Sequence, residues 1–175
     1  MTKIREIRFY RANEKPYGVF SNLYRRDIEF EGTVYKTAEH AYQAGKPRKA
    51  AVREWLMAAP SAALLAMAAH GLYYWDVTPG WSIKKFDRMR RVLRAKFTQH
   101  ADLRELLLST GDARLIESAT TDNPVNRLWG EVNGVGKNML GTMLMELRDE
   151  LAENASRVPI GRRRTKSSAA SVAAL

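Results

Sequence analysis

Residues 17–46 read YGVFSNLYRRDIEFEGTVYKTAEHAYQAGK, and they decide the fold of the first part of this chain. Two stretches rich in β-branched and aromatic residues, 24–30 and 33–35, are separated by Glu31-Gly32. Because glycine readily takes the positive φ angle that a tight hairpin turn requires, this pair predicts a turn between antiparallel strands. We therefore expect a small N-terminal antiparallel sheet that leads directly into a helix.

The helix after the hairpin carries polar side chains at helical spacing. Glu39, Tyr42, Gln43 and Lys46 stand at positions i, i+3, i+4 and i+7, which places them on one helical face. Thr37 is the expected N-cap. Charged helix faces are usually only solvated. We interpret this one as the wall of a cleft, because a phenol and an amide are poor choices for a solubilising face.

The rest of the chain predicts a mostly helical α+β domain. Ile83, Phe86, Met89, Leu93 and Phe97 recur at spacings of three and four, which indicates an amphipathic helix. Its other face is basic, and we interpret that face as solvated in preference to an anion site. The other expected elements are a strand at 4–10 in the small sheet, helices at 37–46, 50–59, 61–70, 103–109 and 137–153, a strand or helical turn at 115–117 and a polar loop at 118–136.

Length and composition narrow the class of protein. A chain of 175 residues is expected to form one domain. It has no cysteine, which excludes disulfides, thiolate catalysis and cysteine-ligated metals. His40, His70 and His100 are spaced without a metal signature, so no metal site is expected. No stretch approaches the roughly twenty apolar residues of a membrane span, and we expect a cytoplasmic protein with no membrane association.

The net charge of +10 is unevenly distributed. Residues 157–175 contain five basic residues and no acidic residue, so half of the net positive charge lies there. This segment is rich in small residues and is expected to be a disordered tail that follows a domain at residues 1–156. The tail could contact nucleic-acid phosphates weakly or be solvated, and the sequence leaves both open.

Several blocks resemble the YbiA-like or NADAR family. They are YGVFSNLY, GTVYKTAEHAYQAGK, WSIKKFDRMRRVLRAKFTQHADLRELLLSTGDARLIE, then WG and GKNMLGTMLMELRDEL, in family order over most of residues 17–151. The resemblance implies a YbiA-like fold and cofactor-free hydrolysis of an N-glycosidic bond to a ribose carbon. One branch of the family acts on phosphoribosyl aminopyrimidines formed early in riboflavin synthesis. Another branch removes ADP-ribose from guanine in nucleic acid.

This chemistry gives candidate roles to two residues of the helix. Cleavage of a ribosyl C–N bond develops positive charge at C1, which a carboxylate stabilises, and Glu39 is the candidate. Alternatively, a neutral Lys46 amine could form a Schiff base with the opened sugar aldehyde. The sequence does not choose between these routes.

Further residues are expected to bind the substrate. Phe20 and Trp129 are candidates to stack on the leaving base, although Trp129 is equally consistent with a core position. Asn22 and Gln43 would hydrogen-bond the base or the sugar, and the helix start around Asn138 would hold phosphate. The remaining substrate-binding candidates are Ser21, Tyr42, Asp122, Asn126 and Gly130.

The chain departs from the family at one position. The family often has an acid three residues before its Trp-Gly pair, where this chain has Asn126. Asp122 lies four residues further upstream and is a candidate to replace that acid. The departure, together with the charge, leaves open a non-catalytic nucleotide or nucleic-acid binding module as an alternative of another class.

Overall fold

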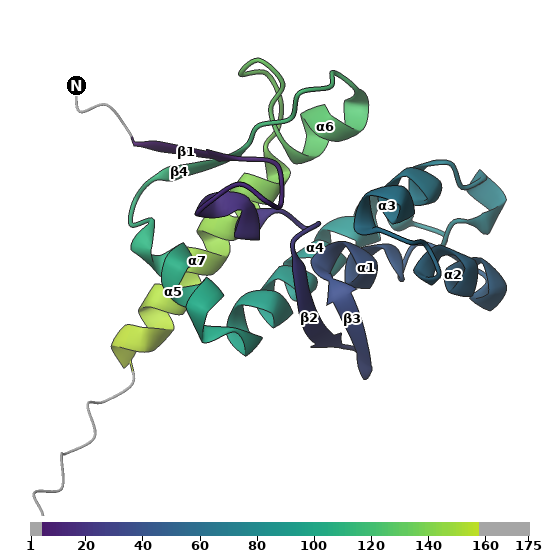
Figure 1. The fold of residues 1–175 in the computed structure, drawn as a ribbon, viewed down its shortest axis with the longest axis horizontal. Coiled ribbons are helices and arrows are strands. Elements are labelled where there is room, and N and C mark those ends of the chain that lie inside the picture. The colour runs from purple at the N-terminus through teal and green to yellow at the C-terminus, as the bar shows by residue number, and fades with distance from the viewer. Residues whose placement is uncertain (1–4, 158–175) are drawn as a thin grey trace, which may run out of the picture.

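The hairpin predicted from the sequence leads into the first helix. This computed structural model describes residues 5–157. Strands β2 (Arg25–Phe30) and β3 (Thr33–Thr37) pair antiparallel, and the turn residues Glu31 and Gly32 have φ angles of 52° and 75°. Helix α1 (Ala38–Gln43) follows immediately. Its N-cap is Thr37, whose side-chain oxygen accepts a hydrogen bond from the His40 N–H. The predicted turn and N-cap are confirmed (Figure 1).

The first strand does not join that sheet. Strand β1 (Glu6–Phe9) pairs in parallel with β4 (Arg114–Glu117), with Phe9 opposite Glu117. The expectation that residues 4–10 extend the antiparallel sheet is therefore wrong. A parallel pair needs a long crossover between its strands, and here most of the domain forms that crossover. Ile7 and Phe9 are buried by this arrangement.

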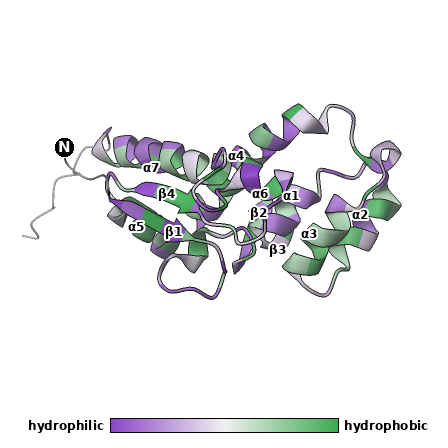
Figure 2. Cartoon of the chain, turned by 90° about the horizontal axis from the view of Figure 1, so that it is seen from above, coloured by the Kyte–Doolittle hydropathy of each residue, from purple (hydrophilic) through white to green (hydrophobic). Residues whose placement is uncertain are grey.

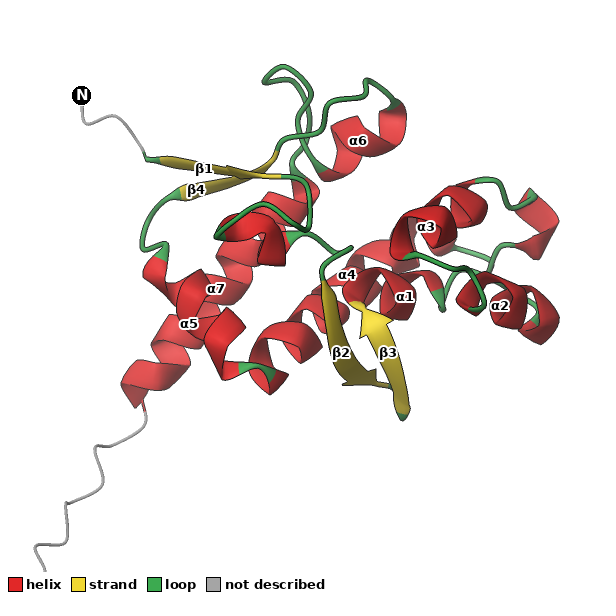
Figure 3. Cartoon of the chain, viewed as in Figure 1, coloured by secondary structure: helices red, strands yellow, loops and turns green. Residues whose placement is uncertain are grey.

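Two long helices form the centre of the fold. Helix α4 (Trp81–Gln99) contributes Met89, Leu93 and Phe97 to the core, as its periodicity predicted. Helix α7 (Met139–Arg157) lies against β4 and α5 (Ala101–Ser109). Figure 2 shows that both apolar and polar residues occur along these helices. The result is the mostly helical α+β fold expected from the sequence (Figure 3).

Two shorter helices lie on the other side of α1 from α7 (Figure 1). They are α2 (Ala50–Met57) and α3 (Ala62–His70), and α3 packs against α1. Two short 3₁₀ helices, η1 (Tyr17–Phe20) and η2 (Tyr74–Asp76), occupy connections. Within residues 5–157, no helix combines the length and apolar character needed to cross a bilayer. Apart from Arg157, which ends α7, the predicted tail lies outside the described residues.

The segment predicted as a loop at 118–136 contains a helix. Helix α6 (Pro124–Trp129) begins where the Asn123 side-chain oxygen accepts a hydrogen bond of 2.9 Å from the Asn126 N–H. Asparagine at the N-cap and proline in the first turn are a recognised helix start. The helix is only six residues long, and it lies in a polar stretch, so the sequence pattern did not predict it.

Candidate active site

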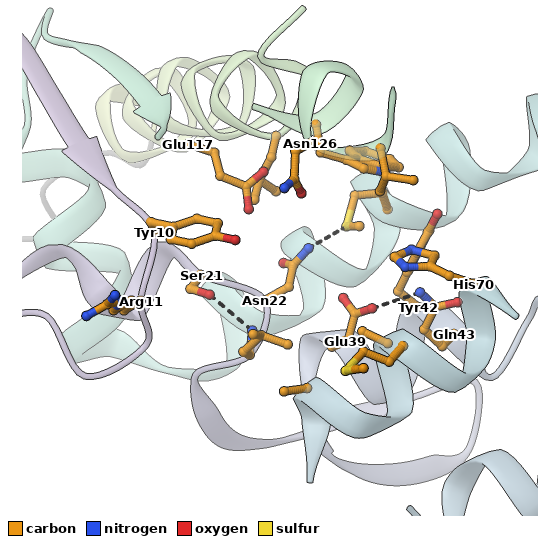
Figure 4. Close-up of a pocket in the computed structure, with 18 residues that line it drawn as sticks. Tyr10, Arg11, Ser21, Asn22, Glu39, Tyr42, Gln43, His70, Glu117 and Asn126 are labelled. Atoms are coloured by element: carbon orange, nitrogen blue, oxygen red, sulfur yellow. Dashed lines mark hydrogen bonds between the residues drawn. The ribbon is translucent and has the colours of Figure 1, made fainter. Parts of the chain in front are cut away.

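One cavity of about 300 Å³ lies between helices α1, α3 and α6 and the end of strand β4. Its walls come from α1, the turn after η1, the inner face of α3, the end of β4, and α6. Figure 4 shows the side chains that line it. Of the twelve residues predicted for the site, the cavity brings together seven, namely Ser21, Asn22, Glu39, Tyr42, Gln43, Asn126 and Trp129.

Glu39 is a buried carboxyl group in the wall that α1 forms. The residue is 8% exposed, and its Oε1 accepts a hydrogen bond of 2.8 Å from Gln43 Nε2. Burial raises the pKa of Glu39 to about 7, against the opposing effects of the Gln43 hydrogen bond and the Lys46 charge. Glu39 therefore titrates near neutral pH, the range suited to an acid or a base.

A second carboxyl group, Glu117, enters the cavity from the end of β4. In Figure 4 it extends from the wall opposite Glu39. Burial, and secondarily the charge of Glu39, raise the pKa of Glu117 to about 7. Its backbone is fixed on both sides, because the Glu117 N–H donates to Asn138 Oδ1 and its carbonyl accepts from the Glu131 N–H.

Lys46 lies beside the cavity and not in its lining. Helix α1 ends at Gln43, so the predicted polar face does not continue to position i+7. The half-buried Lys46 side chain donates a hydrogen bond to the carbonyl oxygen of Ala69. Burial lowers the pKa of Lys46, while the charge of Glu39 opposes that shift. The amine is thus electrostatically coupled to Glu39 without facing the cavity directly.

Aromatic residues form the end of the cavity near α6. Trp129 and Tyr42 both line it, with ring centroids 5.7 Å apart in an edge-to-face arrangement. Tyr42 also packs against Trp81, and burial raises its pKa above the usual range, so its hydroxyl stays protonated. Trp129 is partly exposed, which leaves part of its ring available to a ligand.

The comparison with known proteins assigns the family. A model described as NADAR domain matches residues 8–152. The chain belongs to the NADAR family. N-glycosidase YbiA of Shigella flexneri is 40% identical over 147 residues, covering 83% of this chain and 88% of that protein. A riboflavin biosynthesis protein of Vibrio vulnificus is 34% identical over 150 residues, covering 85% of this chain and 39% of that protein.

A solved structure supports the same assignment. The NMR structure of the E. coli protein YbiA matches this NADAR domain with a TM-score of 0.80 and 35% sequence identity. The match covers 93% of this chain and 94% of the other. The family resemblance and the fold inferred from it are confirmed.

Phe20 does not have the role predicted for it in this NADAR domain. Its side chain is 0% exposed and packs against Phe9, Tyr17 and Phe97, with ring centroids 5.6 to 6.1 Å away. A ring enclosed in this way cannot stack on a leaving base. The η1 turn directs Phe20 into the core, whereas its neighbours Ser21 and Asn22 line the cavity.

Asn138 and Gly130 contact the backbone of Glu117. The Asn138 side chain accepts from the Glu117 N–H and donates to the Leu115 carbonyl, so β4 engages it. The expectation that the helix start around Asn138 holds phosphate stays a prediction. A Cβ atom on Gly130 would lie 2.2 Å from the Glu117 carbonyl oxygen. Glycine is therefore required for close packing against β4. Both residues help to position Glu117, and their predicted contacts with the substrate stay predictions.

Asp122 does not replace the family acid in the cavity. It is exposed and pairs with Arg127 at 2.5 Å, away from the lining residues. Asn126 does line the cavity, while its Nδ2 donates to the Thr121 carbonyl oxygen. The second acid of the cavity is Glu117, on a different element.

Sequence reasoning missed four polar residues of the cavity, namely Glu117, Tyr10, Arg11 and His70. The signal for Glu117 was available, because it ends the TGDARLIE block that supports the family resemblance. The other three lie at the ends of β1 and α3, and no local pattern brings these ends together. Among residues 5–157, no group of three or more His, Asp or Glu side chains gathers in a way that could hold a metal ion.

Proposed function

We propose that this N-glycosidase hydrolyses the C1–N bond between a phosphorylated ribose and an aminopyrimidine, with Glu39 and Glu117 as its acid and base. The proposal depends on one observation: two carboxyl groups from different elements share one cavity and both have a pKa of about 7. Such a pair cannot easily carry two negative charges, so near neutral pH one group is protonated and one is ionised.

These two states match the requirements of the reaction. The protonated carboxyl donates its proton to the leaving nitrogen as the C1–N bond breaks, and the bonding electron pair leaves with that nitrogen. The ionised carboxylate stabilises the positive charge that develops at C1. A water molecule then adds to C1 and gives up a proton to a carboxylate. The products are a free sugar phosphate and the free base.

The remaining lining residues suggest how the substrate is oriented. Trp129 and Tyr42 offer aromatic surface to the leaving base, and Asn126 offers an amide at the same end. Arg11 lies at the other end beside Tyr10 and is exposed (Figure 4). Among residues 5–157, no hydrogen bond or ion pair occupies the Arg11 guanidinium, so it is available for the phosphate.

A second route uses Lys46 as the nucleophile. It is favoured by the lowered pKa of Lys46, which increases the fraction of neutral amine. Ring opening of the glycosylamine would give a C1=N imine to the base; the Lys46 amine would add to C1, and the base amine would leave with its bonding electron pair and a proton. Water would then hydrolyse the Lys46 Schiff base to the free sugar aldehyde and regenerate the amine. To reach C1, the amine must leave the carbonyl oxygen of Ala69.

The substrate class has one rival, ADP-ribose attached to guanine in nucleic acid. The similarity to a protein named for riboflavin biosynthesis supports the aminopyrimidine. The basic residues of 157–175 support the rival, because phosphate contacts strengthen binding to nucleic acid.

An assay of both substrates decides between them. Release of ribose phosphate from a ribosylaminopyrimidine phosphate, unchanged when 157–175 are deleted, is the expected result. Turnover of ADP-ribosylated DNA alone, lost on that deletion, would favour the rival. Salt-sensitive DNA binding without turnover of either substrate would contradict an enzymatic role.

A further inference from the structure

Helix α4 carries two buried cations on one face. Arg88 is 8% exposed and Lys96 is 1% exposed. They are eight positions apart, which returns to the same side of a helix after about two turns and about 12 Å of rise. Met89, which follows Arg88, lines the cavity. The helix that carries the two cations therefore also contributes to the lining of the cavity.

Arg88 holds the wall formed by α1. Its Nε donates to the carbonyl oxygens of Ala41 and Tyr42 at 3.0 Å, and its Nη2 donates to Ala41 at 2.7 Å. These carbonyls belong to the last turn of α1, whose partial negative charge favours a cation, and the Tyr42 carbonyl also accepts a hydrogen bond from the Gly45 N–H. A Cβ atom on Gly45 would lie 2.4 Å from Arg88 Nε, so the chain leaves α1 directly over the guanidinium.

Lys96 holds the opposite wall. Its Nζ donates to the carbonyl oxygens of Val19 at 2.5 Å and Ser21 at 2.9 Å. These oxygens flank the turn that directs Phe20 into the core and brings Ser21 into the cavity lining. The ammonium group also lies 5.7 Å from the Tyr24 ring centroid. One side chain thus fixes both ends of the turn.

Burial of Lys96 costs desolvation energy. Within residues 5–157, Lys96 has no carboxylate partner, and burial lowers its pKa to about 7. An apolar side chain here would leave the carbonyl oxygens of Val19 and Ser21 without this donor, at a cost in stability. The amine does provide more than one donor to backbone oxygens, which an apolar residue cannot do.

We propose that Arg88 and Lys96 are positioning residues: each holds one wall of the cavity, and their shared helix fixes the separation of the walls. Through Arg88, α4 sets the position of Glu39 on α1. Through Lys96, it sets the position of the Ser21 turn. The expected effect on kcat and KM rests on the proposed function. The expected effect on hydrogen exchange in the two walls does not.

The test uses Arg88→Met and Lys96→Met, with Arg94→Met as a matched control. Arg94 lies on the same helix but pairs with Glu150 at the exposed surface. Hydrogen–deuterium exchange of full-length protein is expected to accelerate at residues 38–45 in Arg88→Met and at 17–24 in Lys96→Met. Each variant should leave the other segment unchanged, and the control should change neither.

Kinetics supply the second measurement. Misplacement of a catalytic group by about 1 Å can cost 100-fold in rate, so Arg88→Met is expected to lower kcat by about 10- to 100-fold. Lys96→Met, which releases a binding wall, is expected to act mainly on KM. Arg88→Lys and Lys96→Arg should recover part of each loss, and they replace the methionine variants if those fail to fold.

The outcomes separate the two proposals. Absence of hydrolysis by wild-type protein would contradict the proposed function, and local exchange would still decide the wall-holding role. If exchange accelerates over the whole domain, or if folded variants keep kcat and KM within twofold of wild type, the positioning proposal is wrong.

Discussion

The charge of Glu39 raises the pKa of Glu117 across the cavity, although the two residues are 78 positions apart in sequence. One belongs to the first helix and the other ends a strand that pairs with the first strand of the chain. Their coupling, together with burial, makes the cavity an environment in which a proton is readily shared between two carboxyl groups.

Replacement of either carboxyl group should remove most of the activity. Glu39→Gln and Glu117→Gln keep the side-chain volume but lose the ability to titrate, and we expect kcat to fall by about 10²- to 10⁴-fold in each. Release of sugar phosphate measures the effect. Glu54→Gln, at an exposed position on α2, is the control. Wild-type rates in either cavity variant would rule out the two-carboxyl mechanism.

The pH dependence of the rate should be bell-shaped with its maximum near neutral pH. The reaction needs one carboxyl protonated and one ionised, and both pKa values are about 7. The value of kcat/KM should therefore rise as the first group ionises and fall as the second ionises. Measurements from pH 5 to 9 test this expectation. A flat profile over that range would show that neither carboxyl titrates during the reaction.

The same groups should make the native state less stable as pH rises. A carboxyl whose pKa increases from 4.5 to about 7 on folding binds more protons in the native state between those values. Its stabilising effect is complete below about pH 4.5 and is lost as pH rises to about 7. Relative to the variant with both glutamines, wild type should lose roughly 2 kcal/mol of unfolding free energy per carboxyl group, about 4 kcal/mol in all, between pH 5 and 7.

Urea unfolding of wild type and of the double glutamine variant at both pH values gives this difference directly. The comparison removes the contributions of His40 and His70, whose lowered pKa values act in the opposite direction. Parallel stability curves for the two proteins would mean that the carboxyl pKa values are not raised by folding.

Lys46→Ala should abolish release of free sugar phosphate. The variant loses either the nucleophile or the cation that lowers the pKa of Glu39. Reaction in the presence of cyanoborohydride distinguishes the two roles, because a Schiff base is reduced to a stable adduct. Mass spectrometry that finds the adduct on Lys46 would establish the covalent route. Turnover without an adduct would assign catalysis to the carboxyl pair.

Arg11→Gln should weaken binding of phosphate. We expect KM to rise about tenfold for a phosphorylated substrate and to stay unchanged for its dephosphorylated form, since only the former presents an anion to the guanidinium. Arg53→Gln, at an exposed position on α2 outside the cavity lining, is the matched control. Equal effects on both forms of the substrate would place the phosphate elsewhere.

Local patterns predicted much of the fold. Glu31-Gly32 specified the hairpin turn, Thr37 specified the start of α1, and the spacing of apolar residues specified α4. Each of these signals depends on a few neighbouring residues, so it can be recognised in the sequence directly. The partner of β1 could not be predicted in this way, because β4 lies more than 100 residues later.

The sequence by itself determined the helical domain, its family and one carboxyl group of the site, because turn chemistry, helical periodicity and a continuous motif are local properties. Only the tertiary structure decided that Glu117 faces Glu39, that Phe20 belongs to the core, and that Lys46 lies outside the lining. These facts depend on which elements α4 and β4 bring together. Burial and the proximity of charges, which set the pKa values, exist only after that packing.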